Sequence, residues 1–199
     1  MIKRDLLQKL YVENMLSMQQ IADTQKCSVN TVNYWMSKYK IKKRTISEGV
    51  YAKWNPNGDP FVVYRPRNLE EAMLHGIGLG LYWGEGTKAN KHSIRLGNTD
   101  PRLMLTFIRF LEQAYKIKKE KLKFGLQVFS DMPAQDALYF WQKILCVQKK
   151  QFMKVIVTPS RGVGTYHRKI KHGVLTVYFN NYKLRNILCR EIEKIHEVV

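Results

Sequence analysis

The sequence predicts an α+β protein in two parts, a small all-α domain and a larger domain that combines helices with a sheet. In residues 1–44 the apolar side chains recur at helical spacing only. From residue 68 onward, helical stretches alternate with stretches in which every second residue is apolar, the period of a half-buried strand. Because residues 45–67 are rich in proline, we expect domains at 1–44 and 68–199 joined by a linker.

The first domain is expected to contain three short helices. Helical spacing predicts the first near residues 3–14, a capping box at Ser17 and Gln20 opens the second, and Ser28 caps the third. This pattern resembles the helix-turn-helix of DNA-binding proteins of the recombinase and resolvase type, whose last helix enters the major groove. The outward side chains expected to contact DNA are Asn30, Thr31, Asn33, Tyr34 and Lys38.

A basic arm follows the third helix and includes Lys42, Lys43 and Arg44. A solvated surface explains such a charge cluster in most proteins. After a helix-turn-helix pattern we favour contact with the DNA backbone or the adjacent minor groove.

The linker, residues 45–67, is expected to lack regular structure. Pro56, Pro60 and Pro66 forbid a continuous helix or a central strand across it. Fully extended, about twenty residues reach roughly 40 Å or more. The two domains could therefore occupy neighbouring turns of one duplex.

Residues 75–86, with the sequence HGIGLGLYWGEG, are predicted to form a helix rich in glycine. Each interior glycine costs about 1 kcal/mol relative to alanine, so the helix needs a compensating contact. Gly76, Gly80 and Gly84 recur every four residues and form one bare face, which lets another backbone approach closely. Glu85 ends this helix. The alternative is a glycine-tolerant core helix with an incidental acid.

The rest of the second domain alternates helices and strands. A capping box at Asn68–Glu71 opens the glycine-rich helix, and Asp100-Pro101 opens another. Further helices are expected at 134–145 and 183–196, and strands at 92–98, 121–129, 152–158 and 173–180.

The nine residues 78–86 resemble the LAGLIDADG motif of homing endonucleases. The motif's middle glycine stands at Gly80 and its closing acid-glycine pair at Glu85 and Gly86. Gly78 replaces the motif's first leucine, Trp83 its first aspartate, and Glu85 keeps the charge of its closing aspartate. The resemblance extends from the motif to the C-terminus, roughly two thirds of the chain.

In that family the motif helix is both the subunit interface and the carrier of the metal-binding acid, and a concave antiparallel sheet reads the DNA. The resemblance implies an endonuclease that hydrolyses phosphodiester bonds of double-stranded DNA with Mg²⁺ or Mn²⁺. A single motif implies a homodimer through the motif helix. The residues implied are Gly76, Gly80, Leu81 and Gly84 for the dimer interface, Glu85 and Gly84 for the metal, and Glu85, Lys88, Gln127 and Lys154 for catalysis.

Basic residues in the second domain are expected to hold DNA phosphates. Such residues lie on the expected strands and in residues 161–172, where two glycines and one tyrosine accompany four Lys and Arg residues. A plain antiparallel sheet also has a solvated polar face, and the resemblance decides in favour of DNA. The residues concerned are Arg95, Lys121, Lys123, Arg161, Arg168, Lys169 and Lys171.

Charge and composition narrow the class of partner. The chain has 34 Lys and Arg against 16 Asp and Glu, a formal net charge of +18, which favours a polyanion. We expect no membrane partner, since the sequence has no long apolar run, and an intracellular location, in the cytoplasm, the nucleoid or an organelle matrix. Cys27, Cys146 and Cys189 are odd in number and widely spaced, which argues against a structural zinc site.

Two other functions remain open from the sequence. The same folds could form a transcription regulator in which the motif helix is only a dimer interface and catalysis is lost. The helix-turn-helix alone is also compatible with a recombinase or transposase accessory protein.

Overall fold

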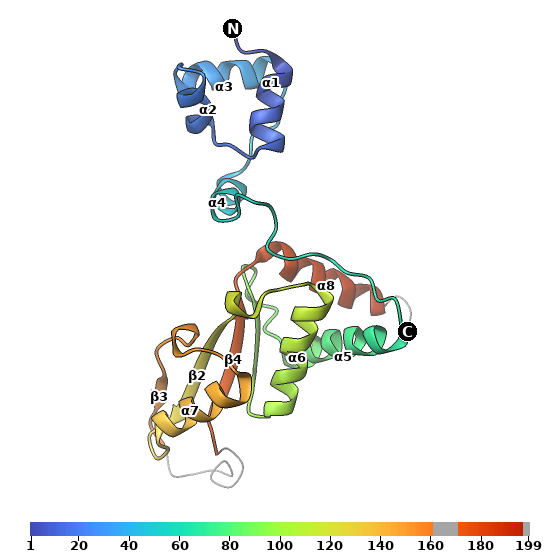
Figure 1. The fold of residues 1–199 in the computed structure, drawn as a ribbon, viewed down its shortest axis with the longest axis vertical. Coiled ribbons are helices and arrows are strands. Elements are labelled where there is room, and N and C mark those ends of the chain that lie inside the picture. The colour runs from blue at the N-terminus through green and yellow to red at the C-terminus, as the bar shows by residue number, and fades with distance from the viewer. Residues whose placement is uncertain (161–170, 197–199) are drawn as a thin grey trace. The chain divides into compact units, whose positions relative to one another are not determined.

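The structure, a computed structural model, describes residues 1–160 and 171–196, so Arg161, Arg168 and Lys169 lie outside the described residues. The chain divides into two compact units, Met1–Pro60 and Phe61–Val199 (Figure 1). Helices and a four-stranded mixed sheet make the protein α+β, as the sequence predicts.

The first unit is all-helical. Leu7, Tyr11, Ile21, Val32 and Met36 form its core together with Ile2 and Ala22. Its elements are α1 (Arg4–Gln8), which continues as the π-helical turn η1 (Lys9–Glu13), then α2 (Met18–Thr24), α3 (Val29–Lys38) and α4 (Ile46–Trp54).

The predicted helix starts in the first unit are confirmed. The Gln20 amide donates to Ser17 Oγ at 3.1 Å, and the Ser17 amide donates to Gln20 Oε1 at 2.9 Å. The Thr31 amide donates to Ser28 Oγ at 3.1 Å. These bonds satisfy amides that have no partner within their own helix, so the local sequence decides where α2 and α3 begin.

Residues 45–67 are more ordered than the predicted linker. Thr45 and Glu48 form a capping box that opens α4, with the Thr45 amide donating to Glu48 Oε2 at 2.7 Å. No proline occurs before Pro56, so nothing in the chain interrupts this helix. At the other end, the Val62 amide donates to the Tyr115 carbonyl oxygen at 2.9 Å, which makes this part of the segment a strap on the second unit.

The second unit contains a sheet with strand order β1-β4-β2-β3. Its elements are α5 (Leu69–Glu85), β1 (Ile94–Asn98), α6 (Pro101–Ala114), η2 (Lys119–Lys121), β2 (Lys123–Phe129), α7 (Ala134–Leu145), η3 (Lys149–Gln151), β3 (Ile156–Thr158), β4 (Val174–Phe179) and α8 (Tyr182–His196).

The sheet is mixed, which corrects the expectation of a wholly antiparallel sheet. β4 pairs antiparallel with β1 and β2, but β3 pairs parallel with β2, with Gln127 opposite Ile156. The chain between β2 and β3 contains α7, and a helical crossover of this kind returns the chain in the same direction. The parallel pair follows from this connection.

One face of the sheet carries the core. Leu175, Val177 and Phe179 alternate along β4 as buried residues, and Phe124 and Leu126 do the same on β2. They join the buried side chains of α6 and α7, which lie on the same side of the sheet (Figure 1). The alternate residues of each strand form the other face, called here the open face.

Candidate nucleic-acid interface

The inner face of α5 packs closely on α6. A Cβ at Gly78 would lie 2.0 Å from Phe110 Cγ, so only glycine fits there. Leu79 and Tyr82 are buried beside it. The Asn68 side chain caps the helix by accepting the Glu71 amide at 2.9 Å, which confirms the predicted start. The inner face thus fixes α5 in the unit.

The outer face of α5 is open. A Cβ at Gly76, Gly80 or Gly84 would meet nothing within 4 Å among the described residues, apart from the helix's own neighbouring backbone. Exposed apolar side chains border these glycines, including Met73 and Ile77. Leu81, predicted for the same contact, is half-buried and packs against the core.

Glu85 is the last residue of α5, and its side chain is exposed. The buried Gly86 leaves the helix and pairs with Leu96, and the Thr87 amide donates to the Arg95 carbonyl oxygen at 2.9 Å. A Cβ at Gly86 would lie 2.3 Å from the Tyr82 carbonyl oxygen. Glycine is therefore needed where the chain turns from α5 to the edge of β1, and Glu85 is held at that edge.

Lys88 caps the end of α5 in this structure. Its ammonium donates to the Tyr82 carbonyl oxygen at 3.4 Å and also to the Trp83 carbonyl oxygen. Arg185 on α8 donates to the Lys88 carbonyl oxygen. Lys88, predicted as catalytic, therefore lies close to Glu85 but binds the helix end, where positive charge is favourable. Arg185 was not predicted, because its contact spans 97 residues and has no local signal.

The open face is built in rows across the strands. Arg95, Tyr178 and Lys123 form the row nearest the end of α5, called here the cationic row. The Arg95 guanidinium lies 5.3 Å from the centre of the Tyr178 ring, and its Nε donates to Ser93 Oγ at 2.8 Å. The predicted DNA contacts Arg95 and Lys123 are thus brought together, with Tyr178 between them.

Gln127 and Lys154 lie away from Glu85. Gln127 lies four residues along β2 from Lys123 and so belongs to another row. The side-chain amide of Gln127 donates to Thr158 Oγ1 at 2.9 Å. Lys154 is exposed and precedes β3, at the edge of the sheet opposite β1. Three strand spacings of about 4.8 Å each separate the two edge strands, β1 and β3. One chain therefore does not bring the predicted catalytic residues together.

The residues present fit only part of a metal site. The described part of the chain contains no cluster of three or more His, Cys, Asp or Glu side chains able to hold a metal ion. Glu85 and the carbonyl oxygen of Gly84 offer the oxygen ligands that Mg²⁺ or Mn²⁺ prefers, but only one carboxylate. A complete oxygen shell needs a carboxylate from elsewhere.

In the first unit the exposed face of α3 carries Asn30, Asn33, Tyr34 and Lys38. These residues share one surface, as predicted for base and phosphate contacts. Thr31 is half-buried, with its Oγ1 2.9 Å from Ser28 Oγ.

The basic arm is partly engaged within the first unit. Arg44 donates to the Met15 carbonyl oxygen at 2.8 Å, and its guanidinium lies 4.1 Å from the centre of the Tyr11 ring. Lys43 Nζ donates to Ser37 Oγ at 3.1 Å, whereas Lys42 is exposed. Arg44 therefore stabilises the unit and is a weaker candidate for DNA contact than Lys42. In the second unit, Lys121 and Lys171 are exposed.

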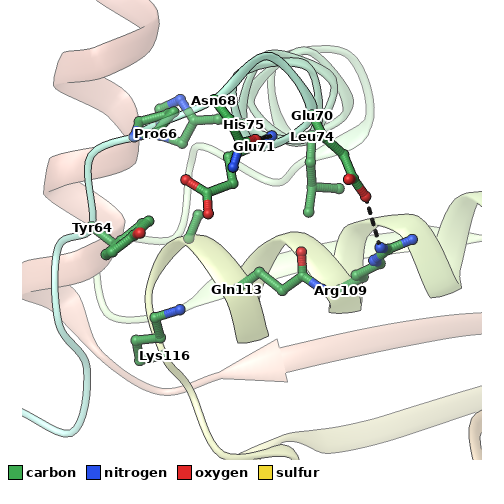
Figure 2. A pocket seen from close by; sticks show the side chains of 11 residues that line it. Tyr64, Pro66, Asn68, Glu70, Glu71, Leu74, His75, Arg109, Gln113 and Lys116 are labelled. Atoms are coloured by element: carbon green, nitrogen blue, oxygen red, sulfur yellow. Dashed lines mark hydrogen bonds and ion pairs between the residues drawn. The ribbon is translucent and has the colours of Figure 1, made fainter.

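A cavity of about 370 Å³ lies between the strap, the start of α5 and the end of α6. Figure 2 shows Tyr64, Glu71, His75 and Lys116 around it, and an ion pair of 3.4 Å between Glu70 and Arg109. His75 and Glu85 are ten residues apart on one helix, so this cavity is about 15 Å from the carboxylate. It is separate from the interface described above.

A half-buried acid, Glu191 on α8, holds α5 to α8 through His75, which also lines this cavity. Tyr115 donates to Glu191 Oε2 at 2.6 Å, and His75 Nε2 lies 3.4 Å from the same oxygen. Burial alone would raise the pKa of Glu191, but the hydrogen bonds from His75 and Tyr115 lower it below its ordinary value. Burial and the bond to Glu191 raise the pKa of Tyr115. Glu191 therefore remains a carboxylate that anchors α5.

Comparison of the chain with protein-family models, with curated proteins and with solved structures gave no match. Within residues 1–160 and 171–196, none of the helices has the length and apolar character needed to span a membrane. The site must therefore be interpreted from its own geometry.

Proposed function

We propose that this protein binds double-stranded DNA and is a homing-type endonuclease of the LAGLIDADG kind, dependent on Mg²⁺ or Mn²⁺ and active as a homodimer. The observation that carries the proposal is α5, which is buried on one side, open along Gly76, Gly80 and Gly84 on the other, and ends at the exposed Glu85. A helix of this form can pack against its own copy.

The homodimer would complete the metal site. Two copies of α5 packed along their glycine faces about a two-fold axis bring two Glu85 carboxylates toward each other. Metal-dependent hydrolysis of a phosphodiester places divalent ions against the scissile phosphate, which these carboxylates would hold. The exposed Met73 and Ile77 support burial of this face, because contiguous exposed apolar surface marks an interaction site.

Two surfaces support DNA as the partner. The cationic row on the open face lies next to the end of α5, where the Thr87 amide binds the Arg95 carbonyl oxygen. In the first unit, Asn30 and Asn33 are exposed on α3, and amide side chains can read adenine in the major groove.

Cleavage of a randomised-site DNA library with Mg²⁺ tests the proposal. Wild type should cut at a defined sequence, and Glu85→Gln should cut about 100-fold less or not at all, because metal ligation contributes several kcal/mol to the transition state. Glu70→Gln is the matched control, an exposed carboxylate at the other end of the same helix, and should cut like wild type. Equal cutting by Glu85→Gln would refute the assignment.

A transcription regulator is the second candidate, and the structure offers one observation in its favour. The Lys88 ammonium is engaged by the end of α5, so each chain supplies Glu85 without a second catalytic group beside it among the described residues. In that function α5 serves only as a dimer interface. Specific binding without cuts from either wild type or Glu85→Gln would make this candidate the better one.

A further inference from the structure

Two short 3₁₀ turns, η2 and η3, are fastened together beside the start of β2. The Gln151 side chain is only 6% exposed and donates to the carbonyl oxygens of Lys119 at 2.9 Å and Leu122 at 3.3 Å. Its own Oε1 accepts the Gln148 amide at 3.2 Å. A buried amide with these partners fixes the two turns relative to each other.

These turns gather lysines with almost no compensating acid. All but the half-buried Lys119 are exposed, and Glu120 is the one carboxylate within the turns. None of the lysines forms an ion pair with a described residue. The residues, called here the lysine cluster, are Lys118, Lys119, Lys121, Lys123, Lys149, Lys150 and Lys154.

Such a concentration of like charge favours an anionic partner. Like charges held close together repel one another and oppose the compact state unless a counter-charge binds. A depression of about 400 Å³ lies within the cluster and is lined by Lys119, Lys123, Lys150 and polar neighbours such as Gln148. An anionic membrane surface is a second possible polyanion, but binding to it usually relies on an amphipathic helix with a large apolar face, and these turns have none.

The cluster continues the cationic row of the open face. Lys123 belongs to both, because it opens β2 and pairs across the sheet with Tyr178, which pairs with Arg95. Two strand spacings, about 10 Å, separate Lys123 from Arg95 at the end of α5. Positive charge therefore lies on both sides of Tyr178, from Arg95 near the end of α5 to Lys123 and on to η2 and η3.

We propose that the lysine cluster binds the phosphate backbone of a duplex whose course follows the cationic row away from Glu85. The cluster thereby extends the bound DNA beyond the base pairs at the carboxylate. This inference rests on the proposed function only in taking DNA as the polyanion, and it does not require cleavage.

The test is the salt dependence of duplex binding by the full chain in EDTA, which prevents cleavage. Lys150→Gln combined with Lys154→Gln removes two phosphate contacts, so the slope of log K against log salt should become less steep by about 1.8. Arg102→Gln combined with Lys143→Gln is the control of equal charge, since both are exposed on α6 and α7, which cover the other face. Its slope should stay near that of wild type.

Equal slopes for the two double variants would overturn the inference. Binding would then depend on the net charge of the protein and not on the position of the lysines. Loss of binding to anionic phospholipid vesicles by the cluster variant, with an unchanged duplex slope, would also overturn it in favour of a membrane surface. Both results are independent of the Glu85→Gln cleavage assay, so the inference and the proposed endonuclease can fail separately.

Discussion

On α5, Gly78 and Gly80 are two residues apart in the sequence and have opposite surroundings. A Cβ at Gly78 would collide with Phe110, whereas one at Gly80 would have no other part of the described chain within 4 Å, apart from its own helix backbone. The first glycine permits close packing inside the unit. The second leaves a bare surface that no described residue covers. Glycine content alone therefore does not identify an interface, and the direction of each glycine must be known.

The largest difference in stability between the two faces of α5 is expected for a substitution at Gly78. Gly78→Ala places a methyl group 2.0 Å from Phe110 Cγ in a fully buried region, and overpacking of this kind should cost about 3 kcal/mol even after the gain in helix propensity. Urea unfolding monitored by circular dichroism gives the free energy of unfolding. Gly76→Ala, two residues earlier on the outer face, is the control. A stability of Gly78→Ala equal to that of wild type would show that the contact with Phe110 can relax.

The outer face of α5 could be predicted from the sequence, whereas the packing of the inner face could not. Four-residue spacing groups Gly76, Gly80 and Gly84 on one side, because the helical period is a local property. That Gly78 packs on α6 depends on Phe110, which lies 32 residues further along the chain. Sequence reasoning therefore identified the stripe but missed the glycine that the core requires.

In the rest of the fold, too, features set by neighbouring residues were predictable and features set by distant residues were not. The starts of α2, α3 and α6 were predicted because Ser17, Ser28 and Asp100 bond amides within a few residues. The alternation of apolar and polar residues along β2 predicted which side of the strand is buried. The parallel pairing of β3 and the bond between Arg185 and Lys88 depend on the path of the whole chain, so no local pattern announces them.

The inner face also depends on charge, which gives a pH-dependent prediction. Glu191→Gln removes the carboxylate shared by Tyr115 and His75 and should lower stability at pH 7 by about 1–2 kcal/mol. Because folding lowers the pKa of Glu191 below 4.5, its contribution is present above about pH 4.5 and is lost as the pH falls through the lowered pKa. The difference in the free energy of unfolding between Glu191→Gln and wild type should therefore become smaller at acidic pH.

Urea unfolding at pH 7 and at about pH 3 measures this difference. Glu193→Gln, an exposed acid on the same helix, is the control and should leave stability nearly unchanged at both pH values. A gap between Glu191→Gln and wild type that stays constant with pH would mean that shape, rather than charge, anchors α5 to α8.

The smallest change in stability is expected for a substitution at Gly80. Its dependence on protein concentration tests whether the outer face of α5 is a dimer interface. Gly80→Ala should stabilise the dilute monomer by about 1 kcal/mol, since alanine favours a helix and no described residue outside the helix's own backbone lies within 4 Å of the added methyl group. The same methyl group would separate two copies of α5, so at high concentration the variant should lose dimer that wild type retains. Sedimentation over a range of concentrations, alongside urea unfolding, separates these effects. Stabilisation at every concentration, with both proteins monomeric, would mean that the bare face has no copy of itself as a partner.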